Sequence, residues 1–371
     1  MKTTPADTPA DTPDATLVTA QVRALGGLDR AISLLDRGFA DPYRIAAFAK
    51  ARSTVIATSD EELRSRAEAN TLHELPAVGV KTAAVIRSAV LGLADLYLAM
   101  LDEETRVAVT ERGAVVRSAI KGDLHTHTDW SDGGASIEAM AQAAAAIGHE
   151  YIAVTDHSGR LTVAKGLDKS RLQGQLDKIA SLREEILERY GIRVLTGVEV
   201  DINEDGSLDG DNDSLSQLDI VVASVHSRIA MPEPEMTQRL LRAVSHPHVD
   251  VLGHCTGRKV VGRGRAGSTA NWELVFAACA SFGTAVEINC RPERLDPPRA
   301  LLRKAHVLGC MFSIDSDAHA PGQLEWQPFG CDRAADSGIE ADRIINALSW
   351  DELRSWTLQG ADPQIVSRAG E

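Results

Sequence analysis

The sequence predicts an α/β protein: a (β/α)7 barrel preceded by a small all-α domain. Two observations carry this prediction. Through the first hundred residues, apolar positions recur at helical spacing, whereas after residue 121 short apolar strand candidates alternate with amphipathic helices. Strand–helix alternation at this spacing implies a parallel sheet, and seven strands favour a closed barrel over an open sheet.

Composition and charge are those of an ordinary soluble globular protein, with 371 residues, 44% hydrophobic and 25% charged. The net charge of 39 − 53 = −14 counts against wholesale non-specific nucleic-acid binding, but a local binding surface is still allowed. Five scattered cysteines without a C-x-x-C pair suit a reducing compartment. There is no apolar run near 18 residues and no signal-peptide hydrophobic region. We therefore expect a cytoplasmic protein with no membrane partner.

The N-terminal part divides into a tail and a helical domain. Residues 1–15 are rich in Pro, Asp and Thr, and such a segment is expected to be disordered because it cannot bury enough apolar surface. Residues 16–105 predict a compact bundle of four or five helices. Asp41-Pro42 is a typical helix start, with the carboxylate as N-cap and proline in the first turn.

The remaining chain is predicted as a connector over 106–120, a barrel over 121–346 and a helical extension over 347–371. The apolar run from Ala114 to Ile120 predicts a short buried strand that leads into Lys121–Thr128. Helices are expected at Ser136–Ile147 and Ser170–Tyr190. The other strand candidates are Tyr151–Thr155, Arg193–Val198, Leu218–Val225, Val249–Gly253, Thr284–Ile288 and Met311–Ile314.

Metal-capable residues follow the strand candidates. His125 and His127 are two positions apart, so in a strand they project from one face, although such a pair also occurs on ordinary exposed strands. Because the carboxyl ends of parallel barrel strands converge on one mouth, we expect the whole set to meet there. Burying so many polar groups without a metal would cost several kcal/mol. The predicted ligands are His125, His127, Asp132, His157, Glu199, His226, His254, Asp317 and His319.

This set, from Asp123 to His319, resembles the polymerase-and-histidinol-phosphatase (PHP) superfamily over residues 121–346. Within this superfamily, the sequence most resembles the C-terminal PHP domain of bacterial family X DNA polymerases. It is carried by Gly166-Leu167-Asp168, Gly197-Val198-Glu199-Val200-Asp201-Ile202, Gly253-His254-Cys255-Thr256-Gly257-Arg258 and Glu287-Ile288-Asn289. The resemblance implies a distorted, TIM-like barrel with an active site, since all nine family ligand positions hold ligand-competent residues.

The resemblance also implies three divalent metal ions and a phosphoesterase reaction. Mixed histidine and carboxylate shells suit Zn, Mn or Fe, and the sequence does not choose among them. A metal-bridged hydroxide would attack phosphorus in line, so no protein nucleophile is needed. The implied sets are His125, His127, Glu199 and Asp317 for the first ion, Glu199, His226 and His254 for the second, and Asp132, His157 and His319 for the third.

Basic residues near the ligands are candidates for gripping a substrate phosphate. Arg258 and Arg294 suit the task because arginine binds phosphate bidentately, and Arg258 joins His125, His127, Glu199 and Asp317 in the expected catalytic set. For Arg294 a surface salt bridge is an equal alternative. Lys165 is a weaker candidate. The remaining histidines are expected to be packing or surface residues: His73, His149, His246, His248 and His306.

Residues Leu75 to Ile86 resemble a helix-hairpin-helix motif, in which backbone amides at a helix N-terminus meet a DNA phosphate. Gly79 and Lys81 are the candidate DNA contacts, and a plain packing hairpin is the alternative. The whole helical domain looks like that of family X polymerases, with two departures. Ala77 stands where that family usually has glycine, and Val85 stands where its lyase members carry a Schiff-base lysine, so lyase chemistry is not expected.

Polymerisation is not expected either, because only residues 106–120 separate two regions between which family X enzymes insert their palm. Our leading hypothesis is DNA 3′-end processing, as a 3′–5′ exonuclease or 3′-phosphatase. The alternative is a histidinol-phosphatase-like enzyme acting on a small phosphate ester. A third hypothesis, a non-catalytic DNA-binding accessory protein, is disfavoured by the complete ligand set. The oligomeric state stays open.

Overall fold

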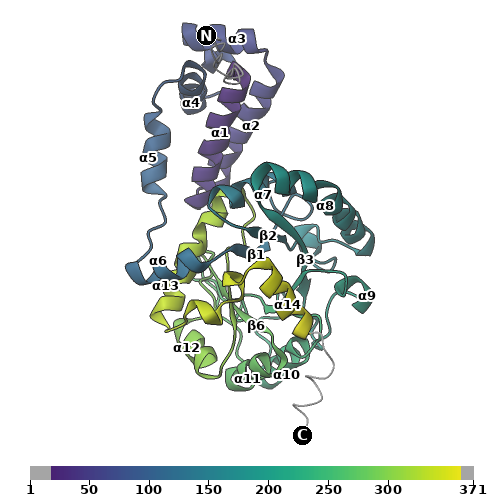
Figure 1. The fold of residues 1–371 in the computed structure, drawn as a ribbon. Helices are drawn as coiled ribbons and strands as arrows, with labels where there is room; N and C mark the ends of the chain where they lie inside the picture. The colour runs from purple at the N-terminus through teal and green to yellow at the C-terminus, as the bar shows by residue number, and fades with distance from the viewer. Residues whose placement is uncertain (1–17, 361–371) are drawn as a thin grey trace, which may run out of the picture. The chain divides into compact units, whose positions relative to one another are not determined.

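The computed structural model describes residues 18–360, which divide between residues 105 and 106 into two compact units (Figure 1). Each unit has its own hydrophobic core. The tail expected over residues 1–15 and the last eleven residues of the expected 347–371 extension lie outside the described residues.

The first unit is a bundle of five α-helices and one 3₁₀ turn, in line with the predicted four or five helices. Leu28, Leu35 and Ile86 are fully buried at its centre, where α1 packs against α2 and α4. The predicted helix start at Asp41-Pro42 is confirmed, since the Asp41 side chain accepts a hydrogen bond from the Tyr43 N–H. The elements are α1 (Ala20–Arg37), α2 (Pro42–Ala57), α3 (Asp60–Ala69), η1 (Leu72–Glu74), α4 (Val80–Leu91) and α5 (Leu96–Glu104).

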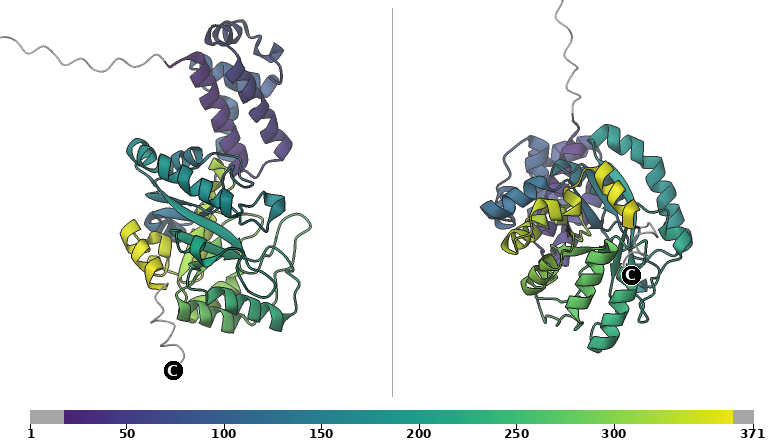
Figure 2. Two further views of the ribbon diagram at one scale, coloured as in Figure 1. Left: turned by 90° about the vertical axis from the view of Figure 1, so that its right-hand side faces the viewer. Right: turned by 60° about the horizontal axis from the view of Figure 1, so that its bottom comes forward.

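The second unit is a nearly closed parallel barrel of seven strands in sequential order, with helices around it (Figures 1 and 2). All neighbouring strands pair in parallel, and a bridge between Thr126 and Ala318 links the first strand to the segment after the last. The strands are β1 (Gly122–Thr126), β2 (Tyr151–Val154), β3 (Arg193–Asp201), β4 (Ile220–Ser224), β5 (Val251–Leu252), β6 (Ala285–Asn289) and β7 (Phe312–Asp315).

The helices of this unit alternate with the strands, as the sequence pattern predicts. The two helices expected at 136–147 and 170–190 correspond to α7 and α8. The elements are α6 (Glu111–Ala119), α7 (Ile137–Ala146), η2 (Thr162–Ala164), α8 (Lys169–Tyr190), α9 (Asn212–Leu215), α10 (Glu233–Val244), α11 (Trp272–Phe282), α12 (Arg299–Val307), η3 (Pro321–Trp326), α13 (Gln327–Asp336), η4 (Ala341–Arg343), η5 (Ile345–Ala347) and α14 (Trp350–Gly360).

The strand predicted over Ala114–Ile120 is wrong, because this run forms the helix α6 and the strand begins only at Gly122. The Thr110 hydroxyl caps α6 by accepting from the Gly113 N–H, and α6 packs against α13. Val116 faces the core while Val115 is 71% exposed, a helical rather than an alternating pattern. A short apolar run does not distinguish a buried strand from a helix, and here packing against α13 decided.

The other six strand predictions overlap β2 to β7. The largest difference is in β3, which continues to Asp201, so Glu199 lies inside the sheet rather than at its end. Among the described residues no single helix is long and apolar enough to cross a membrane, although the bent pair of α4 and α5 reaches that length and composition together.

Candidate metal centre

The Glu199 carboxylate on β3 lies at the middle of a buried group of five histidines. Its Oε2 is 3.4 Å from His125 Nε2, 3.7 Å from His127 Nε2 and 2.7 Å from His157 Nδ1. Its Oε1 is 3.2 Å from His226 Nε2 and 2.9 Å from His254 Nε2. These side chains come from the ends of β1, β2, β4 and β5, so the parallel barrel gathers them as the sequence pattern predicts.

The remaining three predicted ligands adjoin this group. Asp132 Oδ1 is 3.6 Å from His157 Nε2 and 3.4 Å from His319 Nε2. Asp317 Oδ1 is 3.5 Å from His127 Nε2 and 3.6 Å from His319 Nδ1. The structure therefore brings all nine predicted side chains into one continuous cluster.

The donor atoms of this cluster fit divalent metal ions. Both oxygens of Glu199, both ring nitrogens of His127 and both of His226 are buried without a hydrogen-bond partner. Leaving such atoms unpaired costs about 1–3 kcal/mol each, whereas a metal ion would satisfy them. Imidazole with carboxylate is a ligand set that suits first-row transition ions.

Three subsets have ligand atoms within 4.8 Å of one another. One contains His125, His127 and Glu199, which are members of the first expected set. Another contains the third expected set with His127 added. The last joins His157, Glu199 and His226, so it differs from the second expected set, in which His254 takes the place of His157.

The charges of the cluster shift the pKa values of its members in opposite directions. Burial alone would raise the pKa of Glu199, but the surrounding histidines outweigh it and hold that pKa well below its usual range. Burial lowers the pKa of His254 to about 4, whereas for His226 the carboxylates of Glu199 and Asp201 outweigh burial and raise the pKa to about 9. An anionic Glu199 is the form that a metal ion requires.

Glu287 and Asn289 on β6 support the ligands and were not among the predicted site residues. Glu287 Oε1 is 2.6 Å from His125 Nδ1, and the other Glu287 oxygen accepts the His254 backbone N–H. The Asn289 side-chain amide donates to Asp317 Oδ2 at 3.0 Å. The available signal was their spacing, because positions i and i+2 of a strand share one face.

Two arginines after β6 face Asp317. Arg291 Nη1 donates to the Asp317 carbonyl oxygen at 2.9 Å and lies 2.7 Å from His319 Nδ1. Arg294, a predicted phosphate contact, places its Nε 3.4 Å from Asp317 Oδ2. Arg291 was missed by sequence reasoning, because nothing local distinguishes it from a surface arginine.

Arg258 and Lys165 are the other two predicted substrate contacts. The Arg258 Nε donates to the Arg294 carbonyl oxygen at 3.0 Å, and its Nη2 donates to the Leu295 carbonyl oxygen. This guanidinium therefore braces the 291–296 turn. Lys165 is exposed and has a left-handed backbone with φ of 55° after η2.

In the helical unit, the predicted DNA contacts Gly79 and Lys81 lie at the N-terminus of α4. The Gly79 N–H donates to the Thr82 hydroxyl at 2.9 Å, and Lys81 Nζ lies 5.7 Å from the centre of the Tyr97 ring. Ala77 has a φ of 58°, so it adopts the left-handed conformation that glycine usually takes in this turn.

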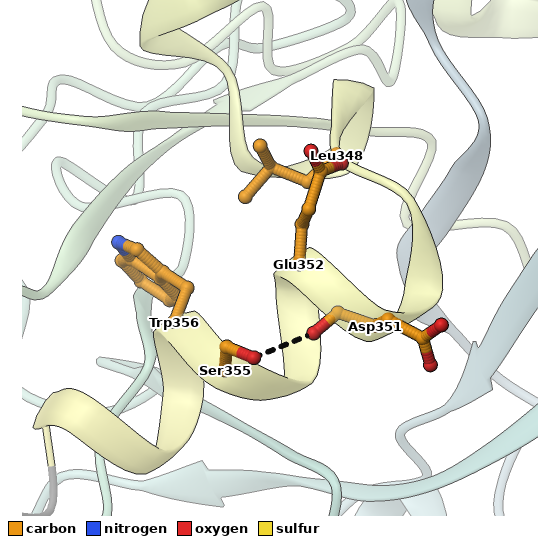
Figure 3. Close-up of a pocket in the computed structure, with 5 residues that line it drawn as sticks. All are labelled: Leu348, Asp351, Glu352, Ser355 and Trp356. Carbon is orange, nitrogen blue, oxygen red and sulfur yellow. Dashed lines mark hydrogen bonds between the residues drawn. The ribbon is translucent and has the colours of Figure 1, made fainter.

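A shallow hollow on α14 lies apart from the cluster, and none of the nine predicted ligands lines it (Figure 3). It is lined by Leu348, Asp351, Glu352, Ser355 and Trp356, and the Ser355 hydroxyl donates to the Asp351 carbonyl oxygen.

The barrel and its cluster define a candidate metal-binding protein of the α/β class, and comparison with known proteins supplies the family. The PHP domain family matches residues 123–289. The chain is 36% identical over 206 residues to a probable phosphatase of Acetivibrio thermocellus, covering 53% of this chain and 78% of that protein. The chain therefore belongs to the PHP family, as its sequence motifs indicate.

A longer relative is the DNA polymerase/3′-5′ exonuclease PolX of Bacillus subtilis, which is 40% identical over 237 residues and 64% of this chain. The match spans only 41% of that polymerase. Among solved structures, the Lactococcus lactis histidinol phosphate phosphatase aligns with a TM-score of 0.43 and 20% identity, over 59% of this chain and 94% of that one. A likeness at that level carries no conclusion about this chain.

Proposed function

We propose that this PHP phosphoesterase processes DNA 3′ ends, as a 3′–5′ exonuclease or a 3′-phosphatase. The observation that carries the proposal is the cluster of nine metal-capable side chains around the buried Glu199. The choice of DNA as substrate is supported by the 40% identity to a protein named as a polymerase and 3′-5′ exonuclease.

His125, His127, Glu199 and Asp317, together with the His226–His254 and Asp132–His157–His319 groups, would hold three divalent ions. Bound ions would supply activation of water and neutralisation of phosphoryl charge. The protein's own groups prepare the ligands. Glu287 accepts from Nδ1 of His125, which would leave Nε2, on the Glu199 side of the ring, to bind an ion.

Asn289 and the two arginines fix Asp317. The Asn289 amide orients Asp317 through a 3.0 Å hydrogen bond, and Arg291 holds the backbone of the same residue. Arg294 adds a second guanidinium beside Asp317. Positive groups fixed beside anionic ligands would favour a phosphate dianion or diester in the same space.

A small phosphate ester is the second candidate substrate. Probable phosphatases such as that of Thermoanaerobacter sp. are 28% identical over 60% of this chain, and the match covers 89% of their own length. These relatives thus consist almost entirely of the matched region, which favours chemistry that the barrel performs by itself.

A parallel assay separates the candidates. The protein with Mn²⁺ or Zn²⁺ is given 3′-recessed DNA, single-stranded DNA and histidinol phosphate. Shortening or 3′-dephosphorylation of DNA, abolished in Asp317→Ala, is the expected result. Phosphate release from histidinol phosphate alone would replace DNA by a small ester as the substrate, and turnover of neither would contradict a catalytic role.

The helical unit is proposed to bind DNA through the α4 N-terminus. Lys81 is exposed there beside the Tyr97 ring. Lys81→Ala should weaken DNA binding several-fold in a fluorescence anisotropy titration, while the matched variant Lys50→Ala on α2 should not. If Lys81→Ala and Lys50→Ala bind DNA with equal affinity, the result would favour the alternative in which the hairpin serves only for packing.

A further inference from the structure

A basic hairpin follows the metal-capable His254. Residues 257–267, called here the basic hairpin, contain four basic residues between 258 and 265 and no acidic one, in a chain with a net charge of −14. Lys259 and Arg265 pair in antiparallel fashion, with backbone N–H···O distances of 2.9 and 2.8 Å. Glycines with positive φ, Gly262 and Gly264, form the tip.

The hairpin is fixed against the turn that carries Arg291 and Arg294. The Val260 N–H donates to the Glu293 carbonyl oxygen at 2.7 Å, and the Arg258 guanidinium donates to the carbonyls of Arg294 and Leu295. At its base, the Thr256 hydroxyl donates to Asp296 at 2.8 Å. The hairpin therefore has a defined position beside the metal centre.

Two of the four basic side chains have hydrogen-bond partners and two do not. Arg258 braces the turn, and Arg265 donates to the Gly257 carbonyl oxygen. The side chains of Lys259 and Arg263 are exposed and make no hydrogen bond or ion pair within residues 18–360. Burial and then the charge of Arg294 lower the pKa of Lys259, while the charge of Glu293 opposes them.

Arg291 and Arg294 lie beside Asp317, and the hairpin that carries Lys259 and Arg263 is bonded to the same turn, in which Glu293 pairs with Arg291. These four basic residues thus stand on two adjoining segments next to Asp317. Two half-exposed apolar side chains, Val260 and Val261, lie on the same hairpin. Repeated positive charge with adjacent apolar surface matches a single nucleic-acid strand, which presents phosphates at regular intervals and apolar sugar and base faces between them. A small monoester has no second phosphate to reach Lys259.

We infer that the basic hairpin binds the phosphodiester backbone of a single DNA strand upstream of the 3′ terminus held at the metal centre. This inference rests on the proposed function and gives it a structural basis. Lys259 and Arg263 would contact the phosphates that precede the reacting one, so they would act on strand binding rather than on the chemical step.

The test uses the full chain with Mn²⁺ and a single-stranded oligonucleotide whose 3′ linkages are phosphorothioates, which slows turnover during anisotropy titrations. The double variant Lys259→Ala/Arg263→Ala should bind roughly tenfold more weakly at low salt. The slope of log affinity against log salt should fall by roughly 1 to 1.5, since each phosphate contact on a single strand contributes about 0.7. Arg303→Ala/Arg354→Ala, which removes two exposed arginines from α12 and α14, should change neither quantity.

A small diester, bis-p-nitrophenyl phosphate, supplies the second readout. Its kcat/KM should be unchanged within twofold in the hairpin variant, because it has no upstream phosphate. Equal oligonucleotide affinity and salt slope in wild type and variant would overturn the inference, as would an equal loss on the small diester.

The two proposals fail in distinguishable ways. If the hairpin variant binds DNA weakly but the wild type never processes DNA, the 3′-end function fails and the hairpin remains a strand-binding surface. If wild type and hairpin variant process and bind DNA equally well, the function stands and the hairpin inference fails.

Discussion

At the residue scale, the orientation of two metal-capable histidines depends on Glu287. One of its oxygens lies 2.6 Å from His125 Nδ1 and the other accepts the His254 backbone N–H. A carboxylate in this position fixes the tautomer of the histidine and raises its basicity toward a metal ion, and removing such a partner typically costs 10–100-fold in metal affinity.

We therefore expect Glu287→Gln to bind Mn²⁺ or Zn²⁺ about 10–100-fold more weakly in a chelator competition titration. The matched control is Glu273→Gln. Glu273 is an exposed residue of α11 and is well separated in sequence from every predicted metal ligand. An affinity for Glu287→Gln equal to that of the control would mean that the carboxylate does not tune the centre.

His149 is a second residue with a measurable consequence, since it is 4% exposed and both its ring nitrogens lack a partner. Burial, followed by the charge of Arg117, lowers its pKa to about 3 from the ordinary 6.5. Between these pH values the unfolded chain binds a proton that the folded chain does not. Stability is therefore unaffected above pH 6.5 and falls as the pH drops from 6.5 toward 3.

His149→Leu should remove this contribution of residue 149 to the pH dependence of stability. Between pH 7 and pH 5.5 the loss of unfolding free energy should be smaller in the variant than in the wild type by about 1 kcal/mol. Urea denaturation followed by tryptophan fluorescence measures it, because all five tryptophans lie in residues 106–371. A pH dependence identical to that of the wild type would show that His149 does not titrate as its burial requires.

At the element scale, the α3–α4 turn of the helical unit keeps its geometry at an energetic cost. Ala77 has a φ of 58°, a conformation that costs an L-residue with a Cβ about 1–2 kcal/mol. The turn nevertheless places Gly79 as N-cap of α4, with the Thr82 hydroxyl bound to its backbone. The left-handed backbone at Ala77 therefore leaves the N-cap of α4 in place.

Ala77→Gly should stabilise the helical unit by about 0.5–1 kcal/mol, because relief of the left-handed strain exceeds the greater chain entropy of glycine. Hydrogen exchange of the slowest amides in α1 and α4 measures the change without relying on a tryptophan signal. Ala46→Gly, at an exposed interior position of α2, should act in the opposite direction by about 1 kcal/mol. Destabilisation by both substitutions would contradict the argument.

At the scale of the whole molecule, the metal centre links the carboxyl ends of the barrel strands, so its occupancy should govern the stability of residues 106–371. The orphaned atoms of Glu199, His127 and His226 penalise the fold when no ion satisfies them. A ligand that binds only the folded chain adds about 2.7 kcal/mol when present at 100 times its Kd.

Mn²⁺ or Zn²⁺ should thus raise the thermal midpoint reported by tryptophan fluorescence, and a chelator should reverse the shift. Glu199→Gln should lose most of this response, because the carboxylate lies at the middle of the five histidines. A midpoint that is insensitive to metal in the wild type, or equally sensitive in the variant, would contradict the assignment of the centre.

The sequence alone determined the barrel and the identity of the clustered residues, because both follow from regular rules. Parallel strands place their carboxyl ends at one mouth, so His127 after the first strand and Asp317 after the last meet whatever the details of packing. Six of the seven strand predictions succeeded for the same reason, since long strand–helix alternation leaves few other folds.

The tertiary structure alone decided the roles of individual polar side chains. Arg258 is a predicted phosphate contact and Arg291 is not, yet Arg258 bonds to the Arg294 carbonyl oxygen 36 residues away while Arg291 faces Asp317 and His319. Packing against α13 likewise made α6 a helix where the apolar run favours a strand. The local sequence pattern specifies on which face of a strand or helix a residue lies. Its hydrogen-bond partner belongs to an element distant in the chain, and only folding brings the two together.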